Sequence, residues 1–177
     1  MNLRRGWPTL GQLTPVYAVI VVLVFSWSLY RFFWRFPSWA FFATAGEIAV
    51  ILAYMTSVNV LESLLVLLTP IVMSVLLPEN WFHSRFVSRS VSLVALALAF
   101  LTYLDSQLQT YAPFPLELYR AAPLAGVAVL WLVFVIDRVA ILRRAVEALA
   151  DRATVFLYVS IPLSLLAVAT VLIRNVS

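Results

Sequence analysis

The charged side chains of this sequence are concentrated in one stretch, DRVAILRRAVEALADR, which runs from Asp137 to Arg152. It holds four arginines and three carboxylates, in a chain with only twelve basic and eight acidic residues among 177. Such a stretch can be a soluble amphipathic helix, a nucleic-acid-binding patch or the water-exposed end of membrane helices. The third interpretation fits best because the basic residues lie between apolar segments, so no nucleic-acid partner is expected. We expect contacts with lipid head groups or a partner protein from Arg138, Arg143, Arg144 and Arg152.

Two further groups of polar residues are candidate sites. Glu47 lies near the middle of an apolar segment, where an ionised carboxylate is costly. We therefore expect Glu47 to be protonated or to meet a partner on another helix or subunit. Asp105, Glu117 and Arg120 lie in one expected loop and can form a polar cluster for a cation or a head group. A solvated loop is the simpler interpretation of these three residues.

The residue types that most catalytic and cofactor sites need are scarce. The chain has no cysteine and one histidine, which excludes disulfides, thiolate chemistry and multi-histidine metal sites within it. It has four glycines, and neither a phosphate-binding loop nor a nucleophile elbow occurs. The sequence therefore favours a chain that is not itself an enzyme. We expect it to bind no cofactor or metal alone, while lipid or quinone contacts stay open.

The composition requires that these residues be positioned by membrane helices. Hydrophobic residues make up 64% of the chain and charged residues 11%, and the mean hydropathy is +1.01. A spanning helix needs about 20 mostly apolar residues. The sequence predicts an all-α fold: a polytopic transmembrane helical bundle of about six spans, forming one integral membrane domain over residues 1–177. The expected spans are residues 16–33, 37–56, 60–77, 88–104, 124–142 and 154–173.

Local signals place the expected breaks between these spans. Pro37 is expected to begin the second helix, because proline is tolerated in a first turn. Asn59, followed by Glu62 three residues later, has the spacing of a capping box at the start of the third. The fifth helix is expected to continue past the membrane into the charged stretch.

The arginines also predict an orientation. Six spans put the first, third and fifth loops on one side, with eight of the twelve arginines. The positive-inside rule then puts these loops in the cytoplasm and both termini outside it, in a multi-pass protein of the cell (plasma or bacterial inner) membrane.

Three functions fit this sequence. The first is a non-catalytic integral membrane subunit or anchor of a larger complex, with membrane lipids and other membrane subunits as partners. The second is a small solute-binding or transport module. In size and helix count the chain is similar to the substrate-binding membrane subunits of energy-coupling factor transporters, a resemblance of topology without a matching motif. The third is the membrane domain of a lipid-modifying enzyme.

Overall fold

The computed structural model of the chain is almost entirely helical over the residues it describes, which are 7–77, 82, 85–110 and 116–176. The side chains of 108–110 and 116–120 are not described. Five helices in this part are long and apolar enough to cross a membrane. The predicted all-α membrane fold is confirmed. The helices are α1 (Leu10–Ala40), α2 (Ala45–Leu76), α4 (Phe86–Thr110), α5 (Leu116–Arg138) and α6 (Ala140–Val176).

The described part has one crossing fewer than the expected six, because the second and third spans form the single helix α2. The break expected at Pro37 does not occur, since α1 continues through this proline to Ala40. Asn59 is not an N-cap either: it lies in the middle of α2 and accepts a hydrogen bond of 2.7 Å from the Ser28 hydroxyl. Unpaired backbone groups are costly in lipid, which favours a continuous helix over a break at a single polar residue.

The charged stretch also lies elsewhere than expected, because from Ala140 onward it forms the first turns of α6 and does not extend α5. The chain turns at Val139 while its helical hydrogen bonds continue. The Val139 amide donates to the Val135 carbonyl at 3.2 Å, and the Arg143 amide donates to the Val139 carbonyl at 3.0 Å. The connection from α5 to α6 is therefore a tight bend without a loop of its own.

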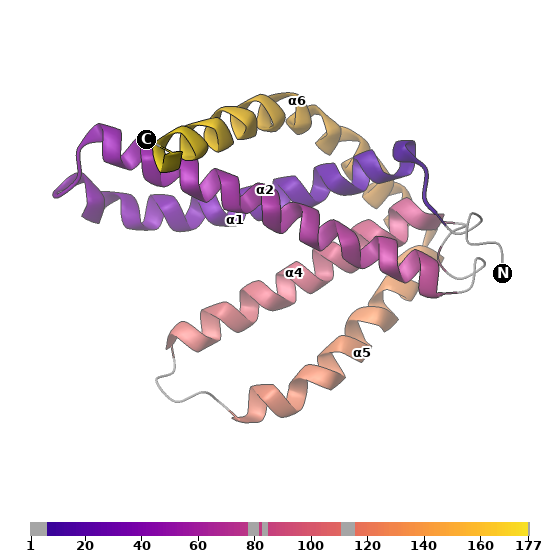
Figure 1. The fold of residues 1–177 in the computed structure, drawn as a ribbon. Helices are drawn as coiled ribbons and strands as arrows, with labels where there is room; N and C mark the ends of the chain where they lie inside the picture. The colour runs from indigo at the N-terminus through magenta and orange to yellow at the C-terminus, as the bar shows by residue number, and fades with distance from the viewer. Residues whose placement is uncertain (1–6, 78–81, 83–84, 111–115, 177) are drawn as a thin grey trace.

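The bundle has two ends, seen in Figure 1, whose side chains differ in character. At the basic end, α1, α4 and α6 begin and α2 and α5 finish, close to Arg85, Arg89 and Arg138. At the opposite, aromatic end lies the α1–α2 turn, with Trp34, Phe41 and Phe42 exposed. All five helices meet near the basic end. Figure 1 shows α4 and α5 diverging from α1, α2 and α6 towards the aromatic end.

The apolar core lies towards the basic end and is centred on α1. It combines the first half of α1 with the start of α4 and the first half of α6. Phe86, the first residue of α4, is 1% exposed, and Ala150 of α6 is fully buried. The core residues of α1 are Val16, Ala18, Val19, Ile20, Val21 and Val24.

In helix α2 the distribution of polar and apolar side chains is the reverse of that in a helix of a soluble protein. Its buried residues are small or polar, whereas many of its leucines face outward, among them Leu61 and Leu65. Helices in lipid gain little from burying leucine and associate through small and polar side chains. The outward apolar face of α2 thus fits contact with lipid. The buried residues of α2 are Thr56, Asn59, Ser63, Pro70 and Ser74.

The helix count changes the expected topology. Five crossings put the beginning of α1 and the end of α6 on opposite sides of a membrane, whereas six would put both termini on one side. Cysteines introduced at Trp7, before α1, and at Val176, at the end of α6, test this, because the chain has no other cysteine. In intact cells an impermeant thiol reagent is expected to label one of the two variants. Equal labelling of both would instead support an even number of crossings.

Candidate functional site

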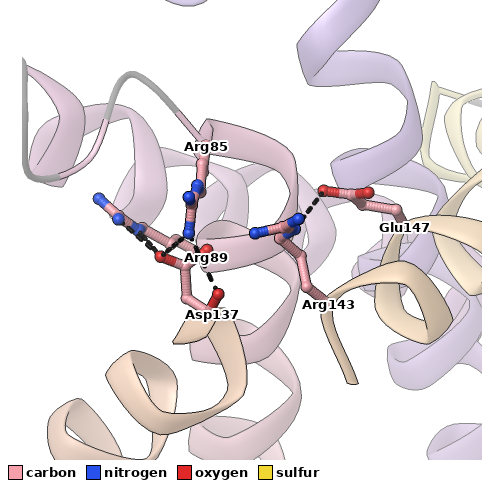
Figure 2. A network of polar contacts seen from close by, with 5 residues as sticks. All are labelled: Arg85, Arg89, Asp137, Arg143 and Glu147. Carbon is pink, nitrogen blue, oxygen red and sulfur yellow. Dashed lines mark hydrogen bonds and ion pairs between the residues drawn. The ribbon is translucent and has the colours of Figure 1, made fainter. Parts of the chain in front are cut away.

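The most buried charged group of the described chain is Asp137, in the last turn of α5 (Figure 2). Arg89 donates to its Oδ2 atom from Nη2 at 2.6 Å and from Nε at 2.9 Å. Arg85 donates from Nη1 to the same oxygen and to the Asp137 backbone carbonyl, both at 3.2 Å. One carboxylate therefore binds two guanidinium groups, and we call these three residues the Asp137 cluster.

The start of α4 brings the two arginines to Asp137. Arg85 and Arg89 are four residues apart, so they lie on one face of the helix. The Asp137 side chain is 4% exposed, Arg89 11% and Arg85 44%. The Arg89 guanidinium also lies 5.9 Å from the ring centre of Phe134, one turn before Asp137 on α5. The cluster thus ties the end of α5 to the start of α4.

The Asp137 cluster is incompletely satisfied within the described residues. Asp137 Oδ1 and Arg89 Nη1 are buried without a hydrogen-bond partner among them. The buried hydroxyls of Ser88, Ser90 and Ser92, on the same part of α4, are also without one. Buried polar groups are normally paired, so the start of α4 is a polar region enclosed by the bundle.

The four arginines expected at the membrane surface do lie near the basic end, but they differ in environment. Arg143 pairs with Glu147 at 4.0 Å, four residues on, and its side chain is 26% exposed. Figure 2 shows this pair beside the Asp137 cluster. Arg138, Arg144 and Arg152 are exposed. Their contacts with head groups or a partner stay a prediction.

Only some of the apolar residues in and after the charged stretch pack into the core. Ala150, Ala153 and Leu157 pack into the core, with Val146 against them. Leu142 and Leu149 remain exposed, next to the arginines. This part of α6 therefore presents both arginine and leucine outward, which suits a membrane interface.

Of the expected polar cluster of Asp105, Glu117 and Arg120, only Asp105 has a described side chain, so the cluster stays a prediction. Asp105 lies near the end of α4 and accepts a hydrogen bond of 2.8 Å from Arg31 of α1. The two side chains are 37% and 41% exposed, so this is a partly exposed ion pair of modest stabilising effect. The side chains of Glu117 and Arg120 lie outside the described residues. Sequence reasoning missed Arg31, because it placed Arg31 and Asp105 on opposite sides of the membrane.

Glu47 is not a buried residue in the middle of a span. It lies in the first turn of α2, where its Oε2 accepts hydrogen bonds from the Thr44 amide at 2.8 Å and the Thr44 hydroxyl at 2.9 Å. In return, the Glu47 amide donates to the Thr44 hydroxyl at 3.3 Å. This is a capping box, and a carboxylate is favourable at a helix N-terminus. The earlier expectation failed because α1 extends past Pro37 and moves the start of α2 to Ala45.

Comparisons with known proteins do not assign this chain to a family. Searches of protein-family models, curated proteins and solved structures each found no match. Among the described residues, no group of three or more His, Asp or Glu could hold a metal ion. The expectation that this chain alone binds no cofactor stays a prediction.

The Asp137 cluster predicts a large effect of removing its one negative charge. Asp137→Asn leaves Arg85 and Arg89 without a counter-charge, at a cost of roughly 3 kcal/mol for a buried pair. The melting temperature of the purified protein is expected to fall by roughly 5 to 10 °C. Asp151→Asn is the matched control, since Asp151 is exposed on α6 near the same end. Equal melting temperatures for the two variants would contradict a stabilising role of the cluster.

The capping box predicts how Glu47 responds to substitution. Glu47→Gln is expected to melt close to wild type, because the amide oxygen can accept the same two hydrogen bonds from Thr44. Glu47→Leu removes both bonds and is expected to lower the melting temperature. The comparison is made by thermal unfolding in detergent. If the leucine variant matches wild type, the box has no measurable effect on stability.

Proposed function

We propose that this chain is a non-catalytic integral membrane subunit that binds another membrane subunit through α5. The observation that carries the proposal is how little of α5 its own chain covers. Of the apolar span of α5, 11% is buried, the same share as in α6, compared with 39% of the apolar span of α1. Helix α5 packs mainly against α4 and α6, and it is fixed at its end by the Asp137 cluster.

Two nearly opposite sides of α5 have features of a helix-packing surface. Leu124, Val127 and Trp131 are 73%, 66% and 65% exposed. On nearly the opposite side of the helix, Ala122 and Gly126 are four residues apart, a spacing that lets two helix backbones approach closely in lipid. A Cβ atom added at Gly126 would meet no atom within 4 Å. The surface at Gly126 is therefore open to a helix of another subunit.

The arginines support an orientation for this subunit. Six of the described arginines lie towards the basic end and four towards the aromatic end. The six are Arg85, Arg89 and the four arginines of residues 137–152, and the four are Arg31, Arg35, Arg120 and Arg174. Arg4 and Arg5 precede α1 in the sequence. The positive-inside rule then places the basic end and the N-terminus in the cytoplasm, and the C-terminus outside, in a bacterial inner membrane.

Gly126→Leu tests the proposal, because it fills the small-residue side of α5 without a clash inside this chain. The variant is expected to fold and melt like wild type, since nothing lies within 4 Å of the new Cβ. Its yield of stoichiometric partner subunits, purified from native membranes in mild detergent, is expected to fall at least about tenfold. The readout is the ratio of each co-purifying protein to the tagged chain.

Gly11→Leu is the matched control. Gly11 is also a helical glycine with no atom within 4 Å of an added Cβ, but it lies in the first turn of α1. Its partner yield is expected to equal that of wild type. A wild-type chain that purifies as a monomer, with a melting temperature that responds to one small solute, would refute the subunit role and favour a transport module.

A further inference from the structure

The second half of α1 combines two arginines with an unusual number of aromatic side chains. Trp27, Tyr30, Arg31, Trp34 and Arg35 follow each other at intervals of three, one, three and one residues, so they share one face of the helix. Their rings are in contact: Trp27 and Tyr30 are stacked at 5.6 Å, and Tyr30 and Trp34 lie 6.5 Å apart. Aromatic and arginine side chains of this kind are typical of a membrane interface.

Two pockets flank this part of α1, and both are lined by Arg31 and Arg35. The first, of about 230 Å³, is lined by the five residues of the aromatic face. The second, of about 260 Å³, lies between α1 and α2, where Phe32 and Trp39 face Ile51 and Met55. Each volume is several times the roughly 30 Å³ that one water molecule takes up in the liquid. A phosphate with its ester substituents is of this size.

The two arginines differ in how they are neutralised. Arg31 pairs with Asp105 at 2.8 Å, and its guanidinium lies 5.9 Å from the ring centre of Trp27. Arg35 is exposed and forms no ion pair with any described residue. Its positive charge is therefore available to both pockets that it lines, while Arg31 is held in place beside it.

We propose that Arg35, with Arg31 beside it, binds the phosphate of an anionic ligand at the aromatic end. The planar guanidinium group binds phosphate oxygens through two parallel hydrogen bonds, which suits it better than lysine for this task. The aromatic side chains on both sides provide apolar surface for the rest of an amphiphile, such as the first carbons of lipid acyl chains. A lipid head group and free phosphate share this chemistry, and their binding is distinguished by experiment.

The experiment follows the melting temperature of the delipidated, detergent-purified full chain during titration with three probes. These are phosphatidylglycerol, inorganic phosphate and a diacylglycerol with the same acyl chains. A ligand that binds only the folded state raises the melting temperature with its concentration. Phosphatidylglycerol is expected to raise it and diacylglycerol to have no effect. A rise with phosphatidylglycerol alone assigns a lipid head group, and a rise with inorganic phosphate as well assigns the phosphate anion itself.

Two variants connect the effect to the pocket. Arg35→Gln is expected to weaken the apparent affinity for phosphatidylglycerol at least about tenfold, the effect of one lost charge-assisted hydrogen-bonding group. Arg174→Gln is the matched control, because Arg174 is an exposed arginine near the same end and lines neither pocket. The proposal is overturned if neither phosphate probe acts, if diacylglycerol acts equally, or if both variants lose affinity alike.

Discussion

The contact of Asp137 with Arg85 and Arg89 is the interaction on which the arrangement of α4, α5 and α6 depends. It joins the last turn of α5 to the first turn of α4, and the bend at Val139 follows two residues later. A buried carboxylate without its counter-charges would be strongly unfavourable, so Asp137 allows little freedom in how α5 meets α4. Because α6 begins directly after the bend, the same contact fixes where the longest helix starts.

This polar anchor has a consequence for the rest of α5. A helix that is held firmly at one end needs little further packing by its own chain, and α5 leaves Leu124, Val127 and Trp131 exposed. In water such a surface would be unfavourable, but in a membrane it contacts lipid or another helix. The proposed subunit role therefore follows from the same feature that stabilises the chain: an anchored α5 with an open apolar face.

The two ends of the molecule show different uses of arginine. At the basic end, Arg89 is nearly buried and serves to hold helices together. At the aromatic end, Arg31 is paired, while Arg35 is exposed between two pockets. A paired arginine contributes to the fold, and an unpaired one beside a pocket is available to a ligand. The proposed phosphate site rests on this difference in environment and not on the number of arginines.

The sequence by itself determined that the chain is an all-α membrane protein, because the hydropathy of a segment is set by its own residues and depends on no distant contact. It also identified the charged stretch beginning at Asp137 as one end of the bundle. It did not reveal that Asp137 pairs with arginines 48 and 52 positions earlier, since that contact exists only once α4 and α5 lie side by side.

Tertiary structure also decided where the helices end. Pro37 and Asn59 resemble helix boundaries when each is judged from its neighbours alone. In the fold α1 continues through Pro37, and Asn59 is bound by Ser28 of the adjacent helix. The start of α2 therefore moves to Ala45, which turns Glu47 from an expected buried carboxylate into a capping residue. A local signal specifies a boundary only when no neighbouring helix satisfies the same polar group in another way.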